Sequence, residues 1–204
     1  MITNAENLIL NCCHSKCNLI KVEIRLTITL IRHAKVNYKF KKYCRHSDFE
    51  KSCVEYDNSP VYDFSRHRAN TIANIIYVSS LRRTYDTSKL LFPDKIPTEN
   101  KLFDEVPIKS FASLPFPLPT TVWFGIGRLQ WLFGMKKQPE SRRATIMRVK
   151  KAIDVLVASD EDVVLINHGI FMRLLVKELK RRGFLLEGVA SYKNLDCIQL
   201  YKLA

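Results

Sequence analysis

No stretch of this sequence approaches the roughly 20 consecutive apolar residues that a membrane-spanning helix requires. The N-terminus also lacks a basic region that leads into an uninterrupted hydrophobic segment, which is the pattern of a secretory signal. The glycine-rich Lys-Ser/Thr loop by which nucleotide-binding enzymes hold phosphates is absent as well. We therefore expect a soluble, cytoplasmic protein with no membrane partner, and not a P-loop nucleotide enzyme.

Cysteine is scarce and irregularly placed. The chain has six cysteines, whose spacing does not resemble a secreted disulfide framework, so we expect reduced thiols. Cys12, Cys13, His14 and Cys17 bring together thiol and imidazole side chains, which are zinc ligands. Because no second pair at a matching spacing follows, zinc is the weaker hypothesis, and we expect neither a metal nor another cofactor.

Acidic residues are few: the chain has 20 aspartates and glutamates against 33 lysines and arginines, which gives a formal net charge of +13. Such a molecule attracts anions over about 8 Å at physiological salt. The sequence has no zinc finger, no glycine-aromatic RNA-binding signature and no basic region followed by heptads. Charge is thus the only argument for nucleic acid, and we expect a phosphorylated small molecule as the partner.

The length of 204 residues and the hydrophobic fraction of 47% predict one domain with a substantial core. Residues 1–20 have weak periodicity and are interpreted as an N-terminal extension, so the domain is expected over residues 21–204. Apolar, β-branched segments predict strands at 22–31, 75–78, 163–166 and 196–201. Helical periodicity predicts helices at 60–72, 81–91, 140–158 and 170–182. This alternation indicates an α/β fold, a three-layer α/β/α sandwich with a mostly parallel central sheet.

Residues 107–139 interrupt the alternation: four prolines between positions 107 and 119 are followed by aromatic residues interleaved with glycines. Proline fixes its own φ and disfavours helix in the preceding residue, so the first half is expected to be non-helical. The second half is compatible with a short amphipathic helix. The segment is either a satellite hydrophobic cluster or a cap over a substrate pocket, and the two interpretations are compatible.

Basic and small polar residues follow three of the predicted strands. In open α/β sheets, ligands bind outside the carboxyl ends of the strands, where the loops converge. The residues at these ends are Arg32, His33, Ser79, Ser80, Arg83, Asn167, His168 and Gly169. Such a set suits a phosphoryl group, because arginine forks bind two of its oxygens and a neutral imidazole can attack phosphorus. A metal would be redundant in a pocket this cationic.

Three ordered motifs carry a resemblance to a known family. "LIRHA", "SSLRRTYDT" and "VVLINHGIFMRLLV" resemble the motifs of the histidine phosphatase superfamily, also called the phosphoglycerate-mutase-like family, over about residues 26–182. The resemblance implies that His33 is the phosphorylated nucleophile, with Arg32 as an oxyanion clamp. It places Arg83 at the phosphate-binding position and makes His168 a donor to the transferring phosphoryl group. Asn37 stands where the family sometimes has a polar phosphate contact.

The family also uses an acid that protonates the leaving oxygen and later activates water. The segment "LFDEVP" offers Asp104 and Glu105, and we choose Glu105 because the segment resembles bacterial members with a similar proline-then-tryptophan insertion. A carboxyl that acts as an acid must hold a proton, which burial against apolar cap residues would favour. The alternative interpretation is an exposed acidic turn.

One departure from the family pattern is Ala34, which replaces the glycine that usually follows the nucleophile. Its methyl group could narrow the space beside the phosphate, or disturb the loop if that position needs a positive φ. The leading hypothesis is a metal-independent phosphatase that hydrolyses a phosphomonoester through a phosphohistidine. The alternatives are a phosphomutase with the same residues, for which the chain looks short, and a non-catalytic phosphate-binding regulatory protein.

Overall fold

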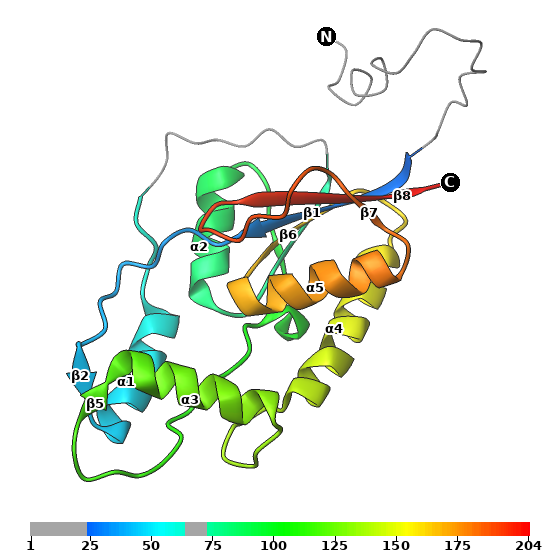
Figure 1. The fold of residues 1–204 in the computed structure, drawn as a ribbon. Coiled ribbons are helices and arrows are strands. Elements are labelled where there is room, and N and C mark those ends of the chain that lie inside the picture. Colours follow the sequence, from blue (N-terminus) through cyan, green and yellow to red (C-terminus); the bar gives the residue numbers. More distant parts are fainter. Residues whose placement is uncertain (1–23, 64–72) are drawn as a thin grey trace, which may run out of the picture.

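The computed structural model describes residues 24–63 and 73–204 and centres on a six-stranded sheet with the order β4-β3-β6-β1-β8-β7. Its strands are β1 (Ile24–Arg32), β3 (Ile75–Val78), β4 (Thr98–Glu99), β6 (Val163–Asn167), β7 (Leu185–Leu186) and β8 (Cys197–Leu203). Strands β4, β3, β6 and β1 run parallel, while β8 and β7 pair in antiparallel fashion at one edge (Figure 1). The mostly parallel sheet is confirmed. The predicted extension, residues 1–20, lies outside the described residues.

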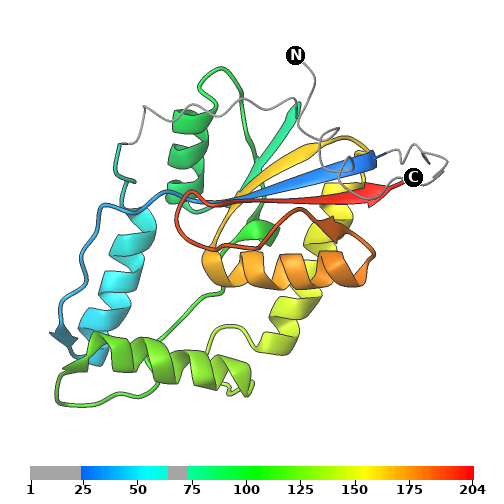
Figure 2. The ribbon, with the colours of Figure 1, turned by 45° about the horizontal axis from the view of Figure 1, so that its top comes forward.

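Helices cover both faces of this sheet (Figure 2). Helix α2 (Arg82–Leu91) packs on one face, and α4 (Arg142–Val157) and α5 (Gly169–Arg181) pack on the other. Alternate residues of a strand point to opposite faces, so Leu30 joins the core beneath α4 and α5 while Ile31 joins the core beneath α2. All five residues of β6 are buried because helices cover this strand from both sides.

A third hydrophobic cluster lies outside these layers. It is formed by α1 (His46–Asn58), α3 (Thr120–Leu132) and the two-stranded sheet of β2 (Tyr43–Cys44) and β5 (Leu118–Pro119). Trp123 of α3 is fully buried at its centre, and its indole N–H donates to the Cys44 carbonyl at 3.0 Å. Residues 104–117 contain no helix, so the expected non-helical segment followed by a short helix is confirmed.

The helix predicted at 60–72 is wrong for its described part, residues 60–63, because that segment is extended. The Asn37 N–H donates to the Pro60 carbonyl, and the Tyr62 N–H donates to the Lys35 carbonyl, so the segment pairs with the loop after β1. The helix in this region is α1, which ends one residue before Ser59; proline at position 60 disfavours helical geometry in that residue. The remainder of the prediction falls on residues 64–72, outside the described ones.

The other three predicted helices correspond to α2, α4 and α5, and the four predicted strands correspond to β1, β3, β6 and β8. The strands that the sequence did not predict, β2, β4, β5 and β7, have two residues each, too few for a periodic pattern. Within the described ranges, no helix combines the length and the hydropathy that crossing a bilayer demands.

Candidate active site

The carboxyl end of β1 and the segment after β3 border a cavity of about 840 Å³. His168, which follows β6, is fully buried and is not among the lining residues. Arg32 and His33 reach it from the end of β1, and Arg83 reaches it from the first turn of α2, which follows β3. The His33 N–H donates to the Asn167 carbonyl at 2.9 Å, and this bond holds the ends of β1 and β6 together. The parallel sheet therefore assembles residues that are far apart in the sequence.

His33 is buried and has a defined tautomer. Its Nδ1 lies 2.7 Å from the Ala34 carbonyl, which can only accept a hydrogen bond, so Nδ1 carries the proton and Nε2 keeps its lone pair. Burial, followed by the charges of Arg83 and Arg32, lowers the pKa of His33 from 6.5 to about 3. The ring is therefore neutral near pH 7, as an attacking nitrogen must be.

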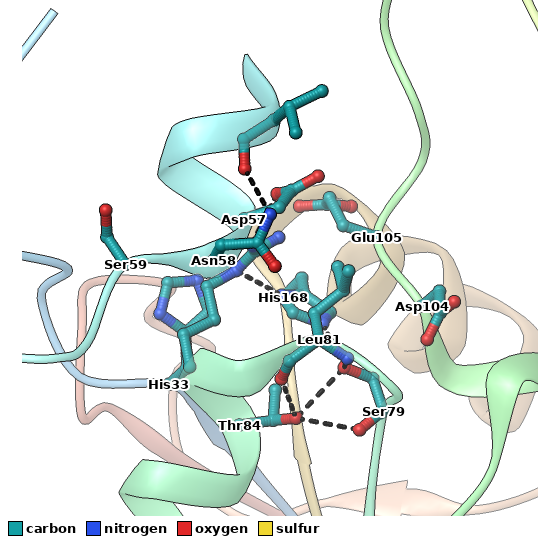
Figure 3. A network of polar contacts seen from close by, with 12 residues as sticks. His33, Asp57, Asn58, Ser59, Ser79, Leu81, Thr84, Asp104, Glu105 and His168 are labelled. Carbon is teal, nitrogen blue, oxygen red and sulfur yellow. Dashed lines mark hydrogen bonds and ion pairs between the residues drawn. The ribbon is translucent and has the colours of Figure 1, made fainter. Parts of the chain in front are cut away.

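His168 lies beside it, with 5.1 Å between the two ring centroids (Figure 3). Its Nδ1 accepts a hydrogen bond from Arg83 Nε at 3.1 Å, so the ring proton is on Nε2, which donates to Ser79 Oγ at 2.7 Å. The Ser79 hydroxyl is then free to donate to Thr84 Oγ1 at 2.9 Å. Complete burial, reinforced by Arg83, lowers the pKa of His168 well below 6.5.

The two arginines differ in how they are held. Besides bonding His168, Arg83 forms a 2.6 Å ion pair with Asp57. Arg32 donates from Nη1 to the Tyr192 carbonyl at 2.5 Å, but its buried Nε has no partner in the described part of the chain. Gly169 makes room for this guanidinium, because a Cβ there would lie 3.2 Å from Arg32 Cζ. An anion bound beside Arg32 would supply the hydrogen-bond acceptor that its buried Nε–H lacks.

The two candidate acids both line the cavity but make different contacts. The Glu105 carboxylate accepts the N–H groups of Ile170 and Phe171 at 3.2 and 3.1 Å, at the N-terminus of α5. Asp104 accepts the N–H of Ser80 at 2.8 Å and also its hydroxyl. Glu105 is thus surrounded by backbone donors at a helix N-terminus, an environment different from the apolar one that the sequence suggested.

The structure does not bring Asn37 to the cavity. Its side chain is exposed and it is not among the lining residues, because residues 35–37 turn away to pair with residues 60–62. Ala34, in contrast, is buried against the site without a positive φ, and its N–H donates to Thr87 Oγ1 at 3.0 Å. The methyl group therefore does not force an unfavourable backbone conformation here.

Sequence reasoning missed Tyr56 and Asp57, which line the cavity from α1. The Tyr56 ring centroid lies 5.0 Å from Arg83 Cζ, and Asp57 pairs with the same guanidinium. The helical spacing of Phe49, Cys53 and Tyr56 was a usable signal for α1. Arg128 and Arg148, which line the cavity from α3 and α4, were not predicted from the sequence either.

No group of three or more histidine, cysteine or acidic residues in positions 24–63 and 73–204 is arranged to hold a metal ion. The possible zinc ligands Cys12, Cys13, His14 and Cys17 lie outside the described residues. Cys44, Cys53 and Cys197 are all free thiols.

The buried histidines predict that the stability of the fold decreases as the pH is lowered. Their folded-state pKa values are lowered, so below pH 6.5 the unfolded chain binds protons that the folded chain does not. Between pH 7.5 and pH 5, the free energy of unfolding should drop by about 2 kcal/mol because of His33, and His168 should lower it further in the same direction. Urea unfolding of wild type and His33→Gln at both pH values measures this, and the variant should lose about 2 kcal/mol less. An identical pH dependence in both proteins would show that His33 is not held neutral.

Residues 28–187 match the family model described as the histidine phosphatase superfamily (branch 1). None of the curated proteins compared with the chain matches it.

Several solved structures share the fold. A mycobacterial glucosyl-3-phosphoglycerate phosphatase superposes with a TM-score of 0.59 at 18% identity, covering 87% of this chain and 96% of that one. A phosphoserine phosphatase mutant from Entamoeba histolytica, in complex with phosphoserine, gives 0.57 at 16% identity, covering 87% and 94%. The product of open reading frame Rv3214 from Mycobacterium tuberculosis gives 0.55 at 19% identity, covering 87% and 95%.

Proposed function

Because the chain belongs to the histidine phosphatase superfamily, we propose that it hydrolyses a phosphomonoester through a covalent phosphohistidine at His33. One observation carries the proposal: the Nδ1 proton of His33 is held by the Ala34 carbonyl, which leaves the Nε2 lone pair available. Arg32 and Arg83 line the same cavity. Nucleophile and anion-binding donors therefore occur together.

In the first step, His33 Nε2 attacks phosphorus, the N–P bond forms and the ester P–O bond breaks. The leaving oxygen takes a proton from the carboxyl group of Glu105. Arg32 and Arg83 stabilise the charge on the equatorial oxygens, Arg32 through its unpartnered Nε.

In the second step, the Glu105 carboxylate takes a proton from water, and the water oxygen attacks phosphorus. The N–P bond breaks, inorganic phosphate leaves, and His33 returns to its neutral form. Glu105 is protonated again, ready for the next ester.

His168 donates to the phosphoryl group only if it gains a second proton. Its Nε2–H is committed to Ser79, and its Nδ1 accepts from Arg83 in the ligand-free arrangement. A phosphoryl dianion would draw Arg83 Nε toward its own oxygens and would favour a proton on Nδ1. Phosphate binding is therefore coupled to protonation of His168.

The hydrophobic cluster formed by α1 and α3 supports the interpretation of these helices as a cap over the substrate. We take this cap to belong to a single domain of residues 21–204. Tyr56, Asp57, Phe124 and Arg128 of these helices line the same cavity as His33. A volume of about 840 Å³ suits a small phosphorylated molecule. The free thiols of Cys44, Cys53 and Cys197 suit a reducing compartment such as the cytoplasm.

The activity is tested with p-nitrophenyl phosphate in the presence of EDTA. We expect release of p-nitrophenol that EDTA does not reduce, because the arginines supply the charge that a metal would otherwise provide. Loss of activity on chelation, with recovery on adding a divalent metal, would contradict the metal-independent mechanism. No release from a panel of phosphomonoesters would favour a non-catalytic phosphate-binding protein.

A further inference from the structure

Arg128 projects into the cavity wall from α3, well away in sequence from the predicted phosphate site. Its Nη1 donates to the carbonyls of Val106 and Pro107 at 3.0 and 3.2 Å. Its Nε and Nη2 make no hydrogen bond to any residue that the structure describes. The side of the guanidinium formed by these two atoms is therefore unused.

Within the described residues, Arg128 also lacks a counter-ion, whereas Arg83 and Arg148 of the same cavity each have one. Arg148 forms two hydrogen bonds with the Glu140 carboxylate, at 3.0 and 2.8 Å, and Arg83 is paired with Asp57. Within the described ranges, Arg128 has no carboxylate oxygen within 4 Å. Burial lowers the pKa of Arg128, which means that the partly buried site disfavours the charged form of this side chain.

The carboxylates on the same cavity wall are engaged elsewhere. Glu105 acts on Arg128 electrostatically, but its oxygens accept backbone N–H groups of α5. Glu50 accepts the hydroxyl of Ser110 at 2.6 Å. Neither side chain occupies the free side of the guanidinium.

We propose that Arg128 binds a second oxyanion of the substrate, a carboxylate or a further phosphoryl group, while Arg32 and Arg83 hold the phosphoryl group that is transferred. The inference rests on the proposed function and adds the class of substrate. The Nε and Nη2 donors of arginine form a planar fork that matches two oxygens of such a group. Lys101 and Lys109 are exposed and line the same cavity, so they add positive charge to it.

The test compares esters that differ in the second anion. 3-Phosphoglycerate and glycerol 3-phosphate differ in a carboxylate, and fructose 1,6-bisphosphate and fructose 6-phosphate differ in a phosphoryl group. In wild type, kcat/KM should favour the doubly anionic member of at least one pair by about 10- to 100-fold, which is the range of a charge-assisted hydrogen bond. The pair that shows the preference identifies the anion.

Arg128→Gln should bring that preference to about 1, and Arg128→Lys should restore part of it because the charge returns without the fork. Arg143→Gln is the matched control, because it removes the same charge from an exposed position outside the cavity lining. Circular dichroism and p-nitrophenyl phosphate hydrolysis establish that each variant is folded and active.

Two outcomes would overturn the proposal: no preference in wild type for either pair, or an equal loss on both members of a pair in Arg128→Gln. If wild type hydrolyses no ester, calorimetric dissociation constants for the same pairs carry the comparison. A preference that Arg128→Gln abolishes in binding would then support the subsite while the catalytic proposal fails.

Discussion

His33→Ala should release p-nitrophenol at least about 1,000-fold more slowly than wild type, because it removes the nitrogen that forms the covalent bond. The arginines and Glu105 remain in place, so the residual rate reports catalysis by positioning and charge alone. Initial rates in EDTA, with protein concentrations matched, measure the effect. Binding of inorganic phosphate should persist in the variant.

The control is His46→Ala, which removes an imidazole on α1 that bonds the Leu114 carbonyl and lies outside the cavity lining. Its rate should equal that of wild type. A His33→Ala rate within tenfold of wild type would mean that another group attacks phosphorus, and the phosphohistidine mechanism would be abandoned.

Glu105→Gln should slow the hydrolysis of an alkyl phosphate by about 100-fold or more while it affects p-nitrophenyl phosphate much less. An alkoxide leaves poorly without a proton, whereas p-nitrophenolate is stable on its own. The amide keeps the size of the side chain and can still accept the Ile170 and Phe171 N–H groups through its oxygen. Rates for glycerol 3-phosphate and p-nitrophenyl phosphate measure the difference.

Asp104→Asn is the matched comparison, because this neighbouring carboxylate also lines the cavity but is bonded to Ser80. It should slow both esters to a similar extent. If Asp104→Asn gives the ester-dependent loss and Glu105→Gln does not, the acid is Asp104. Equal slowing of both esters by Glu105→Gln alone would assign Glu105 a structural role at the start of α5.

Four strands of the sheet could be predicted because they are runs rich in β-branched residues bounded by polar ones, as in residues 163–166. The strand ends then predicted that Arg32, His33, Arg83 and His168 would meet, since parallel strands present their carboxyl ends at one edge. The structure brings these four side chains together. That these side chains lie close together could therefore be predicted from the order of the parallel strands alone.

The sequence could not predict what each polar atom contacts. That Nε2 of His168 faces Ser79, and that Arg83 is shared between His168 and Asp57, depends on rotamers and on the placement of α1. The position of α1 was missed because residues 60–72 look helical, whereas the described residues 60–63 pair with the loop after β1. Such long-range pairing leaves no local periodic pattern.

If His33 carries the phosphoryl group during turnover, the phosphorylated enzyme can be trapped. Wild type mixed with ³²P-labelled substrate and quenched in alkali within milliseconds should yield a labelled peptide, located by mass spectrometry. We expect one label, on His33, that is stable in alkali and lost in acid, as a phosphoramidate is. A label on any other residue, such as an acid-stable ester of serine or threonine, would rule out His33 as the carrier.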